Sequence, residues 1–430
     1  SGLGFGHVRA AQAIEAALLQ QQVHVQILDL WSLINPGATS IIHQTYLRLV
    51  QEYPELYERL YQLDEHTWRQ ILESEEGPPA SVMEVLELIS EIASNSVAEN
   101  TGVQYASDRL LLSMLYTSLH YDRASLAGNG VRARLVLIKW SWLRMRKRLS
   151  SVASSFAPDL VLSTQMIPAA MISSLRSVRR LDVPQIGVLT DYGLHDFWRQ
   201  PGIDRYCAAH DSIVESDDPD RDRVTATVVP LMPAFMQPLP QAEARRQLNL
   251  DVDRPVILIL GGGLGLSVDA IAARLLQSNT TLIVMPGRNA QARSVLAAHA
   301  GSQSDRLHIC GWTDRMDVYI RAADIVVGKP GGISVAEVLA CGRPLFATRS
   351  LGGQEGFNVR FLERNGVGAL VSEDDLVPRI EAAIAQPHDL AEMQRRAWSL
   401  GSRDGAVKIA DLALDFAARR RIQVGQQHLQ

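Results

Sequence analysis

Short apolar runs alternate with glycine turns and amphipathic segments from residue 158 onward, a pattern typical of a parallel α/β fold. Each run is rich in Val, Ile and Leu and is bounded by turn residues, as expected of buried strands. The predicted strands are residues 159–163, 185–190, 255–260, 281–285, 307–310, 324–327 and 344–347, with shorter strands around Tyr206, Ile213 and Val228.

The chain opens on a helical pattern, with Ala10, Ile14 and Leu18 on one face, and residues 24–30 after it predict a strand. A glycine turn such as residues 2–6 usually follows a strand, so we expect the first strand of this domain to be absent. The turn lacks the third spaced glycine of the dinucleotide fingerprint. His7 directly after it is either a general base or a helix-start histidine with a local hydrogen bond.

Residues 324–344 resemble a phosphate-binding unit. A predicted strand leads into Gly331 and Gly332, and Ser334 with Glu337 has the spacing of a capping box at the start of an apolar helix. A helix N-terminus after a glycine turn offers unpaired N–H groups and a favourable dipole to a diphosphate. The alternative is structural, because a capping box and a glycine pair occur at many ordinary helix starts.

Three other loops follow predicted strands and carry polar or glycine residues. Another strand–glycine–helix segment contains Gly261, Gly262 and Gly263. The polar loop 351–358 follows residues 324–344 after one more predicted strand. Asp191 stands where the strand 185–190 ends, which is where ligands bind in open α/β sheets.

Length, charge and cysteine content restrict the class of protein. A chain of 430 residues suits two domains, and its net charge of −5 argues against a general nucleic-acid binder. The three cysteines are widely spaced, form no metal pattern and are expected to be reduced in the cytosol. The sequence has no apolar run of membrane-spanning length and no signal-peptide pattern.

Residues 131–149 predict a basic amphipathic helix with tryptophans, which suits an anionic membrane surface. The alternative is a partly buried helix whose charged face is solvated. The basic residues that we expect at the membrane are Lys139, Arg144, Arg146, Lys147 and Arg148. Residues 74–130 look like an insertion, and a polar tail after Arg421 is expected to be disordered.

Several motifs together resemble the GT-B glycosyltransferases of family 28, nearest to the monogalactosyldiacylglycerol and diglucosyldiacylglycerol synthases. The motifs are Gly4-Phe5-Gly6-His7, Thr190-Asp191, Gly261-Gly262-Gly263, Gly287-Arg288-Asn289, Gly311 to Met316, Lys329 to Gly332, Glu337, and Gly353-Gln354-Glu355 with Asn358. The resemblance implies two Rossmann-like domains that face a central cleft. The expected division is an acceptor-binding domain over 1–235, a nucleotide-sugar domain over 236–395, and a C-terminal helix and tail over 396–430 that pack back toward the first domain.

The resemblance also implies roles for individual residues. It places Gly331 and Gly332 at the donor diphosphate and makes His7 the general base, with Asp191 orienting it or binding acceptor. The capping-box spacing assigns Glu337 to the helix cap, whereas the resemblance assigns it to the ribose hydroxyls. We favour the ribose role. Other residues expected at the donor are Gly262, Gly263, Arg288, Trp312, Thr313, Ser334, Gln354 and Glu355.

The expected activity is inverting, metal-independent transfer of a hexose from a UDP-sugar to a membrane lipid such as diacylglycerol, with no cofactor. We expect a peripheral protein on the cytoplasmic face of the membrane. The alternatives are a transferase for a soluble or natural-product acceptor, a nucleotide-sugar epimerase of the same architecture, and a non-catalytic nucleotide-sugar binding protein.

Overall fold

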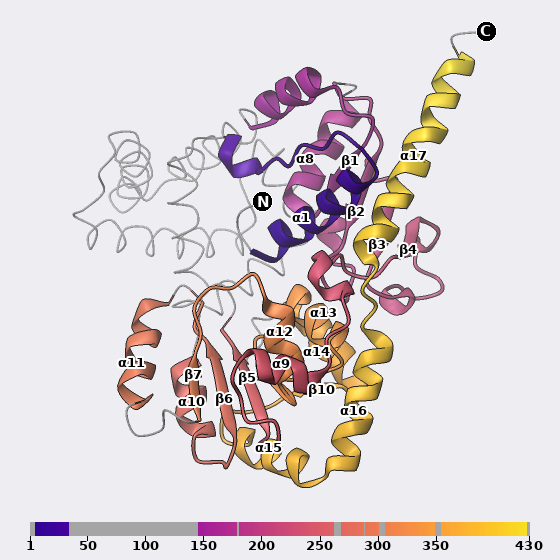
Figure 1. Ribbon diagram of the computed structural model, residues 1–430. Coiled ribbons are helices and arrows are strands. Elements are labelled where there is room, and N and C mark those ends of the chain that lie inside the picture. The colour runs from indigo at the N-terminus through magenta and orange to yellow at the C-terminus, as the bar shows by residue number, and fades with distance from the viewer. Residues whose placement is uncertain are drawn as a thin grey trace, which may run out of the picture. The chain divides into compact units, whose positions relative to one another are not determined.

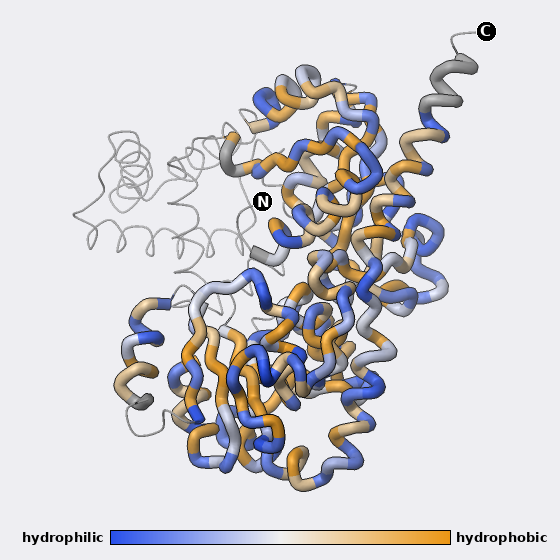
Figure 2. Tube along the Cα trace, in the orientation of Figure 1, coloured by the Kyte–Doolittle hydropathy of each residue, from blue (hydrophilic) through white to orange (hydrophobic). Residues whose placement is uncertain are grey.

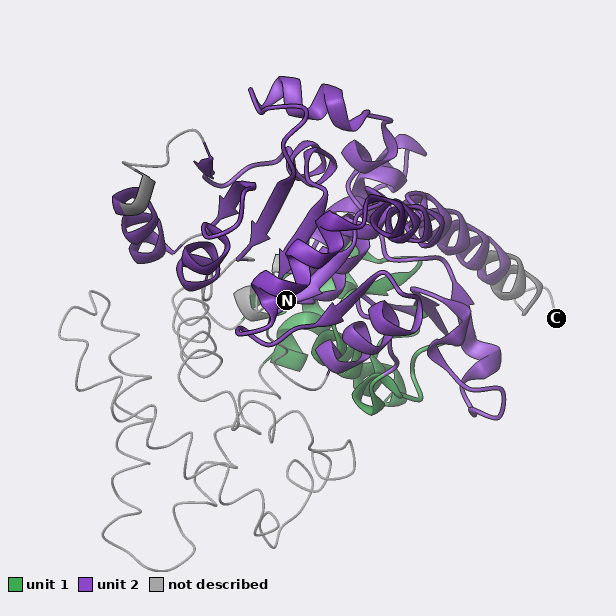
Figure 3. Ribbon diagram, turned by 90° about the horizontal axis from the view of Figure 1, so that it is seen from below, with its two compact units in different colours: residues 1–3, 28–185, 195–204 green, residues 4–27, 186–194, 205–430 purple. Residues whose placement is uncertain are grey.

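The computed structural model describes residues 5–33, 145–178, 180–261, 268–287, 289–300, 306–348 and 354–427. The chain forms two compact units, distinguished by colour in Figure 3. The first unit contains residues 1–3, 28–185 and 195–204, and the second contains residues 4–27, 186–194 and 205–430. The division at residues 235 and 395 stays a prediction, and the 74–130 segment lies outside the described residues.

The second unit contains a six-stranded parallel sheet in the order β10-β9-β8-β5-β6-β7. Five of its strands lie where the apolar runs predict them, whereas β10 was not predicted. The strands are β5 (Val256–Leu260), β6 (Thr281–Met285), β7 (Leu307–Ile309), β8 (Ile325–Gly328), β9 (Leu345–Ala347) and β10 (Gly368–Leu370).

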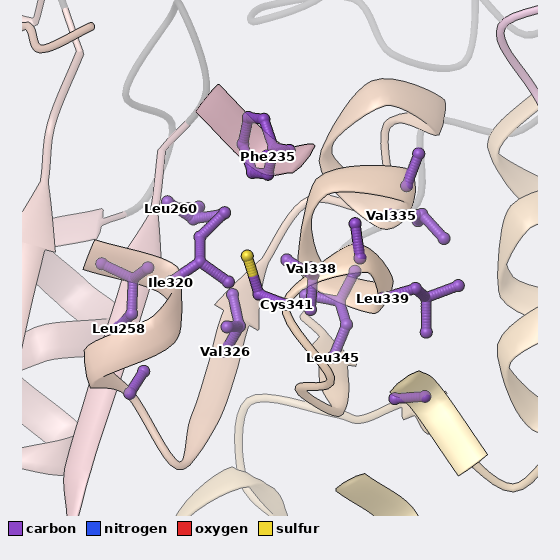
Figure 4. Packing of buried hydrophobic residues seen from close by; sticks show 14 of the residues in the cluster. Phe235, Leu258, Leu260, Ile320, Val326, Val335, Val338, Leu339, Cys341 and Leu345 are labelled. Carbon is purple, nitrogen blue, oxygen red and sulfur yellow. The ribbon is translucent and has the colours of Figure 1, made fainter. Parts of the chain in front are cut away.

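Side-chain alternation along these strands supplies two separate apolar faces. Leu258, Leu260 and Val326 point to one face, where α12 (Met316–Ala322) and α13 (Gly332–Ala340) cover them, as Figure 4 shows. Ile257, Ile259 and their neighbours point to the other face, against α10 (Val268–Leu275), α11 (Ala290–Ala300) and α15 (Leu376–Ala385). Strands buried on both faces explain the continuous apolar runs, which are orange in Figure 2.

A smaller parallel sheet contains β2 (Gln185–Val188), β3 (Arg205–Ala208) and β4 (Val224–Ala226). β2 ends two residues before Thr190 and so carries Thr190 and Asp191 on its C-terminal loop. Three strand predictions here need correction. Ile213 closes a 3-10 turn, β4 ends before Val228, and residues 24–29 have no strand hydrogen bonds within the described part of the chain.

Helix α1 (Phe5–Gln20) packs against both α13 and α17 (Gly405–Gln427), and Figure 1 shows α17 alongside it. The Gln21 side-chain amide donates to Asp411 over 2.8 Å. Helix α14 (Gln354–Arg364) packs against β10, and α16 (Pro387–Leu400) packs against α13. The prediction of a disordered tail from residue 422 is wrong up to Gln427, because α17 continues through that segment.

The first unit has its own small core. Helical residues 145–156 and α8 (Met166–Ser177) bury Met145, Leu149, Met171 and Leu175, and the short strand β1 (Val161–Ser163) follows the first of these helices. Arg176 forms a bidentate pair with Asp204, whose carboxylate also accepts from the Gln185 backbone N–H over 2.7 Å.

The Asp324 carboxylate stabilises the start of the large sheet. It accepts a hydrogen bond from Arg245 of α9 (Gln241–Gln247) over 2.6 Å, from the Gln241 amide over 3.0 Å and from the Val256 backbone N–H over 2.7 Å. We expect Asp324→Ala to lower the free energy of unfolding by about 3–5 kcal/mol, because it leaves the buried Arg245 cation without its carboxylate.

Chemical denaturation of the whole protein measures this effect as a shift of the unfolding transition. The matched control is Glu243→Ala on the same helix, which removes the exposed pair with Arg246 and should change the stability by less than about 0.5 kcal/mol. Equal losses from the two variants would contradict a structural role for the Asp324 cluster.

Candidate functional site

The glycine turn after β8 leads directly into the N-terminus of α13, as the sequence predicts. The helix starts at Gly332, its N-cap is Gly331, and no side chain caps it. The predicted capping box is therefore wrong, because Ser334 lies inside the first turn instead of before it. The first N–H groups of a helix have no acceptor within the helix, so a polar or anionic ligand can satisfy them here.

Gly332 lies against the loop that follows β2. A Cβ atom at Gly332 would be 1.9 Å from the Thr190 carbonyl oxygen and 2.7 Å from Asp191 Oδ1. A Cβ at Gly331, in contrast, would meet nothing closer than 3.9 Å. The two glycines therefore differ in function. Gly331 leaves the turn without a side chain, and Gly332 allows two backbone segments to come into contact.

A chain of polar groups joins α1 to this loop. His7 Nδ1 lies 3.3 Å from Thr190 Oγ1, and the Thr190 hydroxyl donates to Asp191 Oδ2 over 3.4 Å. When that hydroxyl donates to the carboxylate, its oxygen accepts from Nδ1–H of His7. This arrangement selects the tautomer with the lone pair on Nε2, the form that a general base requires.

Asn358 of α14 binds the same loop from its other side. Its amide nitrogen donates to Asp191 Oδ1 over 2.8 Å and to the Pro330 carbonyl over 2.9 Å, while its oxygen accepts from the Tyr192 backbone N–H over 2.8 Å. The sequence places Thr190 and Asn358 in motifs but assigns neither a role. Their polar character at the end of a strand and in the 351–358 loop is the signal that marks them.

Glu337 lies one turn into α13 and is half-buried. Burial raises the pKa of its carboxyl to about 7, the Arg9 charge opposes the rise, and Asp317 adds to it. Arg9 itself is paired with Asp314 over 2.9 Å. A partly desolvated carboxyl group has fewer bound waters to give up than a fully hydrated one. Accepting hydrogen bonds from ligand hydroxyls therefore costs it less free energy.

The remaining predicted donor residues are spread over three loops. Gln354 begins α14, and the buried Glu355 beside it forms an ion pair with Lys329, just before the glycine turn. Trp312 has 52% of its surface exposed after β7, and Thr313 accepts from the Arg315 backbone N–H over 3.0 Å. Predicted site residues Gly262, Gly263 and Arg288 lie outside the described residues.

The basic segment is described only from residue 145. Met145, Leu149 and Ala153 face the core of the first unit, so the apolar stripe of this helix is buried inside the protein. Arg146 donates to Ser174 over 3.4 Å, Arg148 donates to the Leu33 carbonyl, and Lys147 and Arg148 are exposed. Lys139 and Arg144 lie outside the described residues.

Two kinds of feature are not found in the part of the chain that the structure describes. None of its helices has the length and apolar character needed to cross a bilayer. Nor do the described residues bring together three His, Cys, Asp or Glu side chains in a way that suits a metal ion.

Comparison with known proteins identifies relatives of both halves. The family model described as monogalactosyldiacylglycerol (MGDG) synthase matches residues 112–225, and that described as glycosyltransferase family 28 C-terminal domain matches residues 256–409. A processive diacylglycerol beta-glucosyltransferase of Bacillus subtilis (strain 168) is 26% identical over 258 residues, covering 58% of this chain and 66% of the relative. The corresponding protein of Bacillus pumilus (strain SAFR-032) is 28% identical over 268 residues, covering 60% and 69%.

The matches thus span about two thirds of the length of these curated relatives. Among solved structures, MurG of Acinetobacter baumannii has a TM-score of 0.50 at 16% identity, covering 76% of this chain and 96% of that chain. At this identity the likeness concerns the fold, and it confirms the predicted GT-B class with two parallel-sheet domains.

The contrast between the two glycines is testable. Gly332→Ala should displace the Thr190–Asp191 loop or unfold the protein, because its Cβ would overlap a backbone carbonyl. Gly331→Ala is the matched control and should keep the wild-type thermal midpoint, because its Cβ would meet no atom closer than 3.9 Å, an ordinary van der Waals contact. Thermal unfolding of both variants measures the difference. Indistinguishable midpoints for wild type and Gly332→Ala would contradict the close approach.

The half-buried Glu337 carboxyl predicts a pH dependence of stability. Its pKa is raised from 4.5 to about 7, so the stability gained by holding the neutral acid is complete below pH 4.5 and is lost as the pH rises through about 7. Glu337→Gln carries no such charge. The thermal midpoint of Glu337→Gln minus that of wild type should therefore increase from pH 5 to pH 8. The exposed Glu381→Gln serves as the control, and a level difference for both variants would show that Glu337 is not held neutral.

Proposed function

We propose that this chain is a glycosyltransferase of family 28, an inverting hexosyltransferase that uses a UDP-sugar and a membrane lipid such as diacylglycerol. One observation carries the proposal: His7, Thr190 and Asp191 form a hydrogen-bonded chain that touches the Gly331–Gly332 turn within a single compact unit. The diacylglycerol glucosyltransferases among its relatives support the lipid acceptor.

The donor diphosphate would bind at the N-terminus of α13. No atom lies within 3.9 Å of the Cβ position of Gly331, and the helix dipole favours the negative charge of a phosphate. Lys329, ion-paired with Glu355, lies directly before the turn, where its ammonium group would also reach a bound diphosphate. We assign Glu337 to the ribose hydroxyls, Trp312 and Thr313 to the uracil, and Gln354 and Glu355 to the sugar hydroxyls. Gly262, Gly263, Arg288 and Ser334 complete the proposed donor site.

The acceptor hydroxyl would lose its proton to Nε2 of His7 as its oxygen attacks the anomeric carbon. The bond from that carbon to the UDP oxygen breaks, UDP leaves with the electron pair, and the configuration at the carbon inverts. Asp191, through Thr190, stabilises the imidazolium that forms. The charge on the leaving diphosphate is met by N–H groups of α13 and by Lys329, so the proposed reaction needs no metal ion.

The acceptor would be reached at the cytoplasmic face of the membrane. Since the apolar stripe of helical residues 145–156 is buried in the first unit, the proposed attraction is electrostatic. It comes from exposed Lys147 and Arg148, and we assign Arg146, Lys139 and Arg144 to the same role. Each basic residue near an anionic surface contributes about 1 kcal/mol, which is enough in combination for reversible binding.

UDP release by the purified protein tests the proposal. With a mixture of UDP-sugars, we expect release that requires diacylglycerol vesicles, is faster with anionic than with neutral vesicles, and persists in EDTA. His7→Ala should lower the lipid-dependent rate by about 10²- to 10⁴-fold, because it removes the general base. His388→Ala, at an exposed histidine, is the matched control and should keep the wild-type rate.

The arms of this experiment separate the alternatives. UDP binding without lipid-dependent release would reject the lipid transferase and favour a binding protein or another acceptor. Release that is equal in wild type and His7→Ala would remove His7 from the mechanism and leave the activity standing.

A further inference from the structure

The fully buried Asn358 side chain joins the two halves of the proposed site. The amide has no exposed surface, and one nitrogen donates both to the Asp191 carboxylate and to the Pro330 carbonyl. Its oxygen accepts from the Tyr192 backbone N–H. These bonds fix the orientation of the amide, because the flipped form would set its oxygen against two acceptor oxygens.

Packing at neighbouring positions of α14 already holds the same loop in place. A Cβ at Gly193 would lie 2.1 Å from the Phe357 ring, and the rings of Tyr192 and Phe361 have centroids 4.3 Å apart. Phe357 and Phe361 flank Asn358 along the helix and supply apolar contact area that the amide does not. The attachment of α14 to the loop therefore does not depend on Asn358 alone.

The two acceptors of Asn358 belong to different parts of the proposed reaction. Asp191 carries the charge that faces the His7 base through Thr190, whereas the Pro330 carbonyl belongs to the turn that binds the diphosphate. Because a peptide unit is planar, fixing the Pro330 carbonyl also fixes the plane of the Gly331 N–H. Small displacements between reacting groups cost large factors in rate.

We propose that Asn358 is a positioning residue that holds the Asp191 carboxylate and the Pro330–Gly331 peptide on a single nitrogen, and so sets the acceptor side of the reaction in register with the donor turn. This role rests on the proposed function. It predicts that Asn358 acts mainly on turnover and little on donor affinity, since the Gly331 N–H of the peptide that it holds already donates to the Lys329 carbonyl over 3.0 Å.

Two substitutions separate positioning from packing. Asn358→Ala removes all three hydrogen bonds, whereas Asn358→Asp keeps the shape and the acceptor for Tyr192 N–H but loses both donors and sets a carboxylate against Asp191. A protonated aspartic acid regains one donor, and protonation is favoured when two carboxylates share a site. The matched control is Asn365→Ala on the same helix, whose amide donates only to the Phe361 carbonyl.

The experiment measures lipid-dependent kcat from pH 5.5 to 8.5 together with the Kd of UDP by calorimetry. We expect Asn358→Ala to lower kcat by about 10- to 100-fold while the Kd of UDP changes less than about threefold. Asn358→Asp should be slower than Asn358→Ala at pH 8 and should regain activity as the pH falls. Each rate is divided by the wild-type rate at the same pH, so that titration of the nearby His7, Lys329 and Glu355 cancels.

Three outcomes would overturn the proposal. The first is a kcat for Asn358→Ala within twofold of wild type. The second is an equal loss of kcat and of UDP affinity, which indicates general disorder of the unit, and the third is a flat pH ratio for Asn358→Asp. If the wild-type protein binds UDP but shows no lipid-dependent turnover, the proposed function fails, and the role of Asn358 in it fails as well.

Discussion

The contact between Gly332 and the Thr190 carbonyl is the constraint on which the rest of the site depends. It requires that a helix N-terminus and a strand-end loop meet without a side chain between them. Helix α1 packs on α13 and brings His7 to Thr190 and Arg9 toward Glu337, while α14 brings Asn358 to Asp191. The close approach at Gly332 therefore places the polar groups of α1, α14 and the N-terminus of α13 around the Thr190–Asp191 loop.

Five of the six strands of the large sheet were predictable because they read as continuous apolar runs, whereas β10, which is exposed at its end, was not. Predictions failed where the deciding contact is distant in sequence or where two local patterns look alike. Ser334 and Glu337 fit a capping box, but the helix starts at Gly332, which only a glycine can occupy against Thr190. Residues 24–29 have a strand-like composition, yet a strand also needs a partner ladder, which composition does not encode. The bonds of Asn358 to residues 28 and 167 positions away in the chain were invisible for the same reason.

Charge is distributed through the site in a way that suits the proposed metal-independent transfer. Acidic Asp191 is held by neutral donors, Thr190 and Asn358, and so keeps its influence on His7 instead of being cancelled by a cation. Lys329, which is ion-paired with Glu355, and the N-terminus of α13 lie at the glycine turn. In the proposed reaction, separate sets of residues that share one loop would therefore serve the base and the leaving group.

The most direct test of this account is the structure of the product. The protein is incubated with 13C-labelled UDP-sugars and diacylglycerol vesicles in EDTA, and the extracted lipid is examined by NMR at its anomeric carbon. The account predicts a hexosyl diacylglycerol with β configuration, the inverse of the α-linked donor. An α-linked product, or no glycolipid from protein that still binds UDP, would contradict it.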